Sequence, residues 1–151
     1  MNISFEKGIN KNNALTICEW SNEKGEEFQK QWMGSKISYP LDLEKIRKLE
    51  DLFSIFHEEE FIGIIQIIKI EENNAHLGRF ILNPQKVGQG FGKNALKLFV
   101  HHIFEDENIN SITLTVFDSN ITAKKLYEKL GFKIYKVIEF PSLKYIMKRT
   151  R

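Results

Sequence analysis

The residues with the clearest chemical signature form a glycine-rich loop. Gly88, Gly90 and Gly92 precede a segment of helical spacing whose first turn carries Lys93. Glycine allows the backbone to approach a ligand closely, and the free amides at a helix N-terminus, with the helix dipole behind them, bind anions. The loop therefore predicts a phosphate or pyrophosphate site. The alternative is a glycine-rich turn without a ligand, in which Lys93 is only a solvated first-turn residue.

Two named phosphate motifs do not fit this loop. The Walker A motif requires Gly at the position of Val87, and Ser or Thr at the position of Asn94. The dinucleotide fingerprint requires Gly where Lys93 stands, and the strand expected before the loop is not the first of a βαβ repeat. The sequence therefore disfavours nucleotide hydrolysis and hydride transfer.

The spacing of apolar residues predicts the elements that position this loop. Residues 61–70 are apolar at nearly every position, which is typical of a central strand covered on both faces. The helix after the loop keeps apolar residues on one face, and residues 111–117 alternate as in a strand. We expect strands over residues 1–5, 53–57, 61–70, 76–84, 111–117, 133–140 and 143–150, and helices over residues 13–20, 23–32, 42–52, 93–104 and 120–130.

Polar residues indicate where some of these elements begin and end. The pair Ser21-Asn22 predicts the break between the first two helices, and Asp42 predicts the start of the third. Asn120 lies near the start of the last helix, and Gly131 follows its end as a C-terminal cap. The acidic run at residues 58–60 predicts a hairpin turn. Helices followed by the order β-β-β-α-β-α-β-β predict an α/β (α+β) fold with helices on a mixed sheet.

Composition limits the class of protein. The chain has 151 residues, 42% hydrophobic and 28% charged, so we expect a single packed domain over residues 1–151. The 22 basic and 20 acidic residues balance too closely for a protein that mainly neutralises nucleic-acid phosphates. The single cysteine, Cys18, excludes an intrachain disulfide. No secretory signal and no apolar run of roughly 18–20 residues is visible, so we expect a cytoplasmic protein without a membrane partner.

Two motifs occur in order in the second half of the chain. The first, at residues 82–96, is a strand ending in Asn83-Pro84, followed by the glycine loop and a helix. The second, at residues 116–132, is a strand followed by N-I-T-A-K-K-L-Y-E-K-L-G-F. In this order and spacing they resemble the GNAT superfamily of N-acetyltransferases, over about residues 53–151. The resemblance implies a mixed sheet of six to seven strands flanked by helices on both faces, and acetyl-CoA as the acyl donor.

The resemblance also implies roles for individual residues. One strand pairs through its backbone with the pantetheine arm of the cofactor; its residues are Phe80, Ile81 and Leu82. The loop whose amides hold the pyrophosphate consists of Gly88, Gln89, Gly90, Phe91, Gly92 and Lys93. Asn120 matches the asparagine that contacts the cofactor near pantetheine, and Tyr127 matches the tyrosine that protonates the leaving thiolate. Helix capping alone is the alternative for Asn120, and packing alone is the alternative for Tyr127.

The chemistry of thioester aminolysis fits these roles. A neutral amine attacks the carbonyl, the carbonyl oxygen gathers negative charge, and a thiol leaves. A strand amide opened by a bulge or splay near Ile81 or Leu82 can stabilise this oxyanion. The leaving thiol has a pKa of about 8.5 and tyrosine of about 10, which is close enough for Tyr127 to donate a proton as the C–S bond breaks.

Two positions depart from the family pattern. Val87 replaces a frequent Gln or Arg, but most pyrophosphate contacts are made by the backbone, so cofactor binding is expected to survive. Thr115 stands where many members have a Glu, and threonine cannot act as a general base. An alkylammonium has a pKa of about 10.4, so only on the order of one amine in a thousand is neutral near pH 7. The candidate proton acceptors are bulk solvent or, through water, Glu59, Glu60, His76 or Asp118.

We therefore expect an acetyl-CoA-dependent N-acetyltransferase that acetylates a primary amine by direct attack in a ternary complex, without a metal. The main alternative is a non-catalytic CoA-binding sensor or scaffold of the same fold. A nucleic-acid partner, disfavoured by the net charge, would use Lys93, Lys97, Lys124, Lys125 and Lys129. The acceptor is a small molecule or a peptide: a protein N-terminus, a lysine, an amino acid, a polyamine and an aminoglycoside all stay open, as does a homodimer. Trp20, Trp32 and Tyr39 either line the acceptor pocket or pack in the core.

Overall fold

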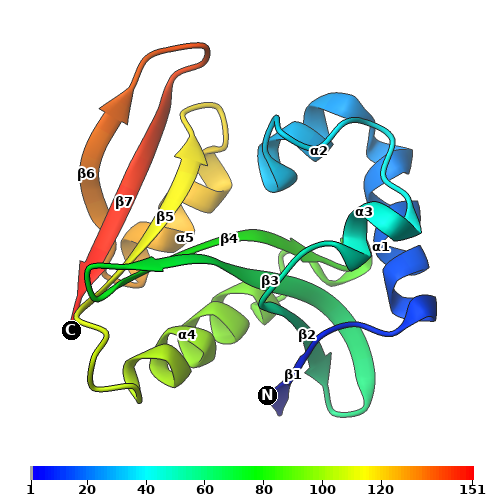
Figure 1. Ribbon diagram of the computed structural model, residues 1–151, viewed down its shortest axis with the longest axis horizontal. Coiled ribbons are helices and arrows are strands. Elements are labelled where there is room, and N and C mark those ends of the chain that lie inside the picture. The colour runs from blue at the N-terminus through cyan, green and yellow to red at the C-terminus, as the bar shows by residue number, and fades with distance from the viewer. Residues whose placement is uncertain (1) are drawn as a thin grey trace. The chain divides into compact units, whose positions relative to one another are not determined.

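The computed structural model describes residues 2–151. Over these residues the chain forms one seven-stranded sheet, in the order β1-β2-β3-β4-β5-β7-β6, and five α-helices (Figure 1). The strands are β1 (Ile3–Lys7), β2 (Leu52–His57), β3 (Glu60–Glu71), β4 (Asn74–Leu82), β5 (Ser111–Phe117), β6 (Lys133–Ile138) and β7 (Lys144–Thr150). The helices are α1 (Lys11–Lys24), α2 (Glu26–Met33), α3 (Leu43–Arg47), α4 (Phe91–Phe104) and α5 (Ile121–Lys129), with a short 3-10 helix at Pro84–Lys86. The expected α/β fold with a mixed sheet is confirmed.

The described chain divides into two compact units. Unit 1 contains residues 2–67 and 78–95, and unit 2 contains residues 68–77 and 96–151. The strands β3 and β4 and the helix α4 each continue from one unit into the other. The expectation of one domain over residues 1–151 stays a prediction.

Unit 1 combines an antiparallel part of the sheet with the three N-terminal helices. β1 pairs with β2, and β2 pairs with β3 across the two-residue turn Glu58-Glu59. The strand expected over residues 1–5 is β1, while the first residue of that range, Met1, lies outside the described residues. Helices and strands share a cluster of buried side chains: Ala14, Ile17, Cys18, Met33, Leu41, Ile46, Leu52, Ile64 and Ile81.

The break between the first two helices lies at Gly25, so the prediction of a break at Ser21-Asn22 was wrong. Gly25 has a φ of 93°, in the left-handed region that glycine adopts without a steric penalty. Ser21 is buried inside α1, and its Oγ accepts a hydrogen bond from Trp32 Nε1 at 2.8 Å. The Asn22 side chain bonds the backbone of Leu41 through both its oxygen and its nitrogen. These polar groups therefore hold segments of unit 1 together instead of capping helices.

The third helix begins where the sequence predicts and ends earlier. The Oδ1 of Asp42 accepts a hydrogen bond from the backbone nitrogen of Lys45 at 2.9 Å, as an N-cap does. The helix ends at Arg47, and Leu52 opens β2 instead of closing α3. Between them Asp51 has a φ of 51°, which is incompatible with a continuing right-handed helix.

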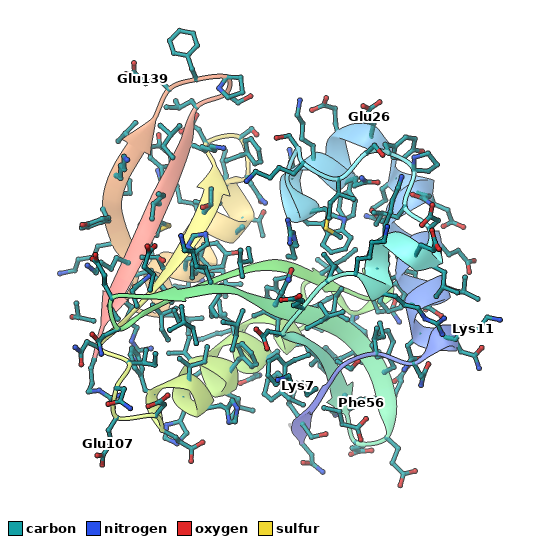
Figure 2. The ribbon with its side chains drawn as sticks, viewed as in Figure 1. Lys7, Lys11, Glu26, Phe56, Glu107 and Glu139 are labelled. Atoms are coloured by element: carbon teal, nitrogen blue, oxygen red, sulfur yellow. The ribbon has the colours of Figure 1, made fainter. Side chains whose placement is uncertain are left out.

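Unit 2 contains the only parallel pair of strands among those whose register the described residues define. β4 and β5 pair from Asn74↔Ser111 to Leu77↔Leu114. β5 then pairs with β7, and β7 with the edge strand β6, both antiparallel; the three lie side by side in Figure 1. The β6–β7 connection passes Glu139, labelled at its tip in Figure 2, and the neighbouring Phe140 is 84% exposed. The strand predicted at residues 111–117 coincides with β5.

Candidate functional site

β4 has a defined pairing with β5 as far as Leu77, and its backbone becomes irregular after that residue. Its parallel ladder with β5 covers residues 74–77, and residues 78–82 belong to unit 1. In this second part Arg79 has a φ of 49°, a left-handed conformation that is uncommon for a residue other than glycine. Such a residue inside a strand produces the kind of local irregularity that a β-bulge does. It lies two residues before Ile81, close to the position where the sequence predicts a bulge or splay.

The guanidinium of Arg79 fixes this irregular backbone within unit 1. Its Nε donates to the carbonyl oxygen of Met33 at 3.0 Å, and its Nη1 donates to Gln66 Oε1 at 3.0 Å. Gln66 is itself buried and donates to the carbonyl oxygen of Glu50 at 2.7 Å. Burial lowers the pKa of Arg79 from its ordinary value, but the guanidinium stays charged. No sequence motif pointed to Arg79, which the structure shows to be the anchor of the β4 backbone.

The predicted cofactor strand follows directly. Ile81 is buried in the apolar cluster of unit 1, while Phe80 and Leu82 are half-buried. The backbone nitrogen of Asn83 donates to the carbonyl oxygen of Ile62 at 2.7 Å, which ties the end of β4 to β3. The strand is thus held firmly along its β3 edge.

The glycine loop has the backbone conformation that its composition predicts. Gly88 and Gly90 have φ values of 81° and 88°, so both positions favour glycine. Asn94 closes the loop on α4, because its backbone nitrogen and its Nδ2 both donate to the carbonyl oxygen of Gly90, at 3.1 and 2.9 Å. The side chain of Gln89 donates back to the carbonyl oxygen of Gln85 at 2.7 Å. The loop is exposed at residues 87–90, directly before the first amides of α4, which have no intrahelical partner.

Two side chains in this region have roles that the sequence did not indicate. Phe91 is buried, with its ring centroid 4.9 Å from that of His57, so only its backbone amide is available to a ligand. Lys86 lies against the same ring, with Nζ 5.3 Å from the centroid, and pairs with Glu60 at 3.2 Å. Glu60 therefore balances the charge of Lys86, and the exposed Lys93 carries the positive charge at the end of the loop.

Asn120 and Tyr127 belong to unit 2, whereas the predicted site residues at positions 80–93 belong to unit 1. Asn120 is the N-cap of α5, and its Oδ1 accepts from the backbone nitrogen of Ala123 at 3.2 Å. The cap uses only the side-chain oxygen, and the amide NH₂ group of Asn120 can still donate a hydrogen bond. The structure therefore shows Asn120 as a helix cap, which is one of the two roles considered from the sequence. Its contact with the cofactor stays a prediction.

Tyr127 is fixed by the end of its helix. Phe132 N donates to the carbonyl oxygen of Tyr127 at 3.0 Å, and Gly131 N donates to that of Glu128 at 3.1 Å. These two bonds, with Gly131 at a φ of 90°, form a Schellman motif. The apolar contact that accompanies this motif joins the rings of Tyr127 and Phe132, 6.2 Å apart. Tyr127 is half-buried as a whole, and burial raises the pKa of its hydroxyl to about 12, so near neutral pH the phenol is protonated and is a weaker acid than an ordinary tyrosine.

A row of polar residues lines one face of the β4–β5 pair in unit 2. On β5 the apolar side chains at residues 112, 114 and 116 are buried on one face, and Ser111, Thr113 and Thr115 lie on the other. The parallel register sets this polar row beside Asn74 and His76 of β4. The alternation in SITLTVF is a signal that could have revealed the polar row, but its partner strand is not visible in the sequence.

The candidate proton acceptors have different surroundings. Glu60 pairs with Lys86, and Asp118 accepts a hydrogen bond from the Tyr145 hydroxyl at 2.6 Å. His76 belongs to the polar row in unit 2. Glu59 lies in the exposed β2–β3 turn of unit 1.

The aromatic residues considered for an acceptor pocket take part in packing within unit 1. Trp20 stacks on Phe61 with ring centroids 5.9 Å apart, and Trp32 bonds Ser21 as described above. The hydroxyl of Tyr39 donates to the carbonyl oxygen of Asn22 at 3.0 Å. Cys18 is buried, as its apolar surroundings in the sequence predict.

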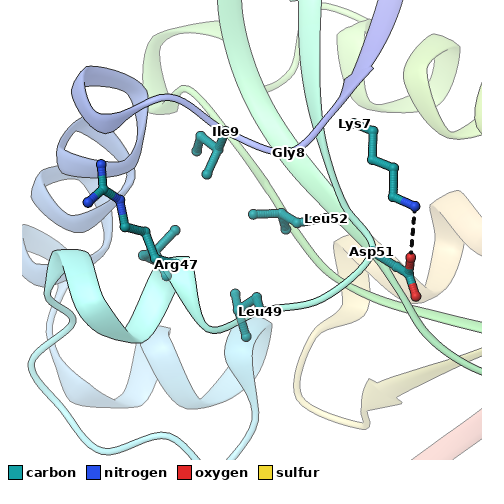
Figure 3. A pocket seen from close by; sticks show the side chains of 8 residues that line it. Lys7, Gly8, Ile9, Arg47, Leu49, Asp51 and Leu52 are labelled. Atoms are coloured by element: carbon teal, nitrogen blue, oxygen red, sulfur yellow. Dashed lines mark ion pairs between the residues drawn. The ribbon is translucent and has the colours of Figure 1, made fainter.

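A small pocket of about 240 Å³ in unit 1 contains none of the predicted site residues (Figure 3). An apolar wall that includes Ile9, Leu49 and Leu52 faces the Lys7–Asp51 ion pair, whose atoms lie 3.2 Å apart. This volume is below the usual range for ligand sites, and the ion pair balances its own charge. The pocket is therefore not a candidate for acyl transfer.

The chemistry of the loop fits a diphosphate group better than a metal. Exposed amides, two left-handed glycines and the nearby Lys93 all favour an anion. Among residues 2–151 the structure contains no group of three or more His, Cys, Asp or Glu side chains that could hold a metal ion. In the same range, no helix is long and apolar enough to cross a membrane.

The chain is similar to known acetyltransferases. The spermine/spermidine N(1)-acetyltransferase of Bacillus subtilis (strain 168) is 28% identical over 101 residues, which span 62% of this chain and 66% of the relative. The chain thus covers just under two thirds of that protein. Acetyltransferase PseH of Campylobacter jejuni (serotype O:23/36, strain 81-176) is 26% identical over 133 residues, which span 84% of this chain and 81% of the relative.

Solved structures share the fold along nearly the whole chain. The spermidine N-acetyltransferase from Vibrio cholerae in complex with CoA and spermine has a TM-score of 0.79 at 20% identity, covering 99% of this chain and 95% of that one. The aminoglycoside acetyltransferase AAC(6')-Ib in complex with coenzyme A has a TM-score of 0.74 at 18% identity, covering 99% and 95%. The model of the acetyltransferase (GNAT) family matches residues 15–132. The resemblance predicted from the two motifs is confirmed, and the chain belongs to the acetyltransferase (GNAT) family.

Proposed function

We propose that this chain is an acetyl-CoA-dependent N-acetyltransferase that acetylates a primary amine by direct attack in a ternary complex. The observation that carries the proposal is the glycine loop at the start of α4, held open by left-handed Gly88 and Gly90 in a chain of this family. This loop is suited to a diphosphate, which coenzyme A contains.

The backbone supplies most of the cofactor site. The amides of residues 88–93 bind the pyrophosphate, and Lys93 adds positive charge beside it. The backbone of β4 at Phe80, Ile81 and Leu82 pairs with the pantetheine arm. The hydrogen bond from Asn83 to β3 holds this strand in place for that pairing. The NH₂ group of Asn120 donates to the cofactor while its oxygen caps α5.

Tyr127 supplies the proton for the leaving group. Its raised pKa of about 12 keeps the phenol protonated throughout the physiological range. This pKa lies further from the thiol pKa of about 8.5 than that of an ordinary tyrosine, so the hydrogen bond to the departing sulfur must precede proton transfer. The thiolate gathers negative charge as the C–S bond breaks, so a positioned phenol becomes a better hydrogen-bond donor to it in the transition state. A β4 amide near Ile81 or Leu82 stabilises the oxyanion that forms on the thioester carbonyl.

We further propose a polyamine as the first acceptor class to test. The support comes from the curated relatives from Bacillus subtilis, which are named spermine/spermidine and probable spermine N(1)-acetyltransferases. An aminoglycoside is the second class, since an aminoglycoside acetyltransferase shares the fold. The homodimer stays a prediction, which sedimentation of the purified protein tests.

Calorimetry and a thiol-release assay test this function together. Calorimetry is expected to detect binding of both coenzyme A and acetyl-CoA. Thiol release from acetyl-CoA is expected to depend on spermidine, spermine or kanamycin. The variant Tyr127→Phe should bind coenzyme A as the wild type does and lose on the order of a hundredfold in turnover.

Two other results separate the alternatives. Tight coenzyme A binding without acetylation of any amine in a broad panel would support the non-catalytic sensor or scaffold. The absence of heat with either form of the coenzyme would remove the proposal altogether.

A further inference from the structure

The polar row of unit 2 is a continuous chain of hydrogen bonds. The Oγ of Ser111 donates to Asn74 Oδ1 at 2.7 Å, and Asn74 Nδ2 donates to Thr113 Oγ1 at 2.9 Å. The Nδ1 of His76 lies 2.7 Å from Thr113 Oγ1, and its Nε2 lies 3.3 Å from Thr115 Oγ1. Ser111 and Thr113 are buried, whereas Thr115 is exposed. The chain thus leads from the interior to the surface through an imidazole ring.

Hydroxyl groups suit both protonation states of this imidazole. A hydroxyl can donate one hydrogen bond and accept two. When His76 is neutral with its hydrogen on Nδ1, that hydrogen goes to Thr113 and the Nε2 lone pair accepts the hydrogen of Thr115. When His76 is protonated, both nitrogens donate, and both threonine oxygens can accept. The network therefore accommodates a proton arriving from the Thr115 side without losing a partner.

The resting imidazole is neutral near pH 7. Burial lowers the pKa of His76 from its ordinary value of 6.5, and a neutral ring is the form that can accept a proton. The ring stays half-buried, so it keeps access to the surface through Thr115.

Charged side chains also lie on the neighbouring strands. Lys69 is on β3, and Lys148 of β7 is the register partner of Thr113. Lys69 pairs with Glu71 at 2.9 Å, and the Nζ of Lys148 lies 4.4 Å from the centroid of the Tyr135 ring. Glu71 balances the charge of Lys69, so burial of the ring is the cause of the lowered pKa of His76.

Two of the other three side-chain candidates from the sequence are engaged elsewhere. Glu60 pairs with Lys86, Asp118 accepts from the Tyr145 hydroxyl, and neither belongs to the chain that reaches Thr115. Thr115 itself, on β5, belongs to the same unit as α5 and Tyr127, and β5 contacts α5. A hydroxyl at this position cannot be the final proton acceptor, but it can pass a proton on.

We propose that His76, acting through the hydroxyl of Thr115, accepts the proton that the amine acceptor must lose before it attacks the thioester. This inference rests on the proposed N-acetyltransferase function and deepens it. Thr115 is the residue that contacts the amine, and His76 is the positioning residue behind it that holds the proton.

Deprotonation of the amine and transfer of the acetyl group conserve atoms and charge. One N–H bond of the ammonium breaks, its proton binds Thr115 Oγ1, and the original hydroxyl proton of Thr115 moves to His76 Nε2. The nitrogen keeps the electron pair of the broken bond and uses it to attack the carbonyl carbon. The C–S bond breaks with its electron pair on sulfur, and Tyr127 supplies the proton of the free thiol. The second amine proton lost on amide formation restores Tyr127, and the imidazolium returns its proton to water.

Four variants of the full chain test this relay in the thiol-release assay with spermidine. His76→Gln keeps a polar side chain of similar length that cannot take up a proton, and Thr115→Val removes only the exposed hydroxyl. Thr115→Ser keeps the hydroxyl, and His101→Gln is the matched control for losing an exposed histidine of α4. Calorimetry with coenzyme A checks that each variant keeps its binding site.

The expected pattern depends on pH. At pH 7, His76→Gln and Thr115→Val are each expected to lower kcat by at least about tenfold, with coenzyme A affinity within about twofold of wild type. The double variant should be no slower than the slower single variant, because both act on one proton path. At pH 10 a large fraction of the amine is already neutral, so the deficit should shrink to about threefold or less. His101→Gln should retain the wild-type rate, and Thr115→Ser, which keeps the hydroxyl, should lose much less than Thr115→Val.

The opposite results would overturn the relay. Equal deficits at pH 7 and pH 10, or fully additive losses in the double variant, indicate a structural role only. Imidazole ¹⁵N spectra that place the resting hydrogen of His76 on Nε2 exclude the proposed direction of transfer. If the wild type is active and the His76 and Thr115 variants are equally fast, the relay is wrong but the proposed function stands. If the wild type binds coenzyme A but acetylates no amine, both the proposed function and the relay are wrong.

Discussion

Gly63 of β3 and Ile81 of β4 approach so closely that a Cβ atom at position 63 would collide with the carbonyl oxygen of Ile81. The next nearest atoms belong to Leu82, whose Cδ2 and Cα would lie 3.0 and 3.1 Å away. A strand glycine of this kind marks a place where another backbone must come close. Because Ile81 and Leu82 carry the proposed acyl-donor contacts, the absence of a side chain at Gly63 sets where those contacts lie.

Replacing Gly63 by alanine should therefore displace β4 as well as weaken the fold. The added methyl group meets backbone atoms, which cannot move aside as a flexible side chain can, so we expect a loss of about 1–3 kcal/mol in the free energy of unfolding. Coenzyme A affinity should fall at the same time, because the β4 backbone shifts. Denaturant unfolding and calorimetry measure the two effects.

The control for this variant is Ile70→Ala, at an exposed position of the same strand. It should change stability by no more than about 0.5 kcal/mol. Unchanged coenzyme A affinity in a destabilised Gly63→Ala protein would separate the β3–β4 approach from the cofactor site.

Arg79 combines a strained backbone with a stabilising side chain, and two substitutions separate these effects. Arg79→Ala removes the hydrogen bonds to Met33 and Gln66 while keeping a residue that resists the left-handed conformation. We expect it to lose about 2–3 kcal/mol of unfolding free energy. Arg79→Gly loses the same bonds without the conformational cost, so it should be more stable than Arg79→Ala by about 1 kcal/mol.

Urea denaturation of the two Arg79 variants side by side gives this difference. If the alanine variant proves as stable as the glycine variant, residue 79 does not adopt a positive φ in solution. The irregularity of β4 would then have another cause.

The fold was predictable where local chemistry decides the outcome. Asp42 caps α3 as expected, and residues 111–117 alternate because one face of β5 is buried. The boundary between α1 and α2 was misplaced because Ser and Asn side chains serve equally well as helix caps and as buried hydrogen-bonding groups. Only the position of Gly25, with its left-handed backbone, decides between the two roles.

In the candidate site, too, only the residues whose local conformation decides their role could be predicted from the sequence. The loop glycines could be read from the sequence, since few other residues adopt their conformation. Arg79 could not, because its partners Gln66 and Met33 lie 13 and 46 residues away and arginine carries no signal for a positive φ. The contact between His76 and Thr113 spans 37 residues and depends on the parallel register of β4 and β5, which only the folded sheet defines.

Gly88 should matter for cofactor binding more than for stability. Its φ of 81° disfavours a side chain, but a Cβ at this position would meet no atom within 4 Å. In Gly88→Ala the left-handed conformation should cost about 1 kcal/mol, so the free loop leaves it. Coenzyme A must then restore this conformation when it binds, and its affinity falls by that cost. The dissociation constant should rise about fivefold. Val87→Ala, at the adjacent exposed position, should bind as the wild type does, and equal affinities of the two variants would argue against the loop as the diphosphate site.

Tyr127 should leave a signature in the pH dependence of stability. Burial raises its pKa in the folded protein to about 12, against about 10 for an unfolded tyrosine. Between these values the folded state binds the phenolic proton more tightly than the unfolded state, so unfolding releases it. The contribution of Tyr127 is therefore fully present below pH 10 and is lost as the pH rises toward 12. Unfolding free energies measured in urea from pH 8 to pH 11.5 should fall more steeply for wild type than for Tyr127→Phe, in which the other alkaline titrations are retained. Parallel curves would show that the hydroxyl is hydrated in the folded protein, which would exclude a desolvated Tyr127 phenol as the proton donor.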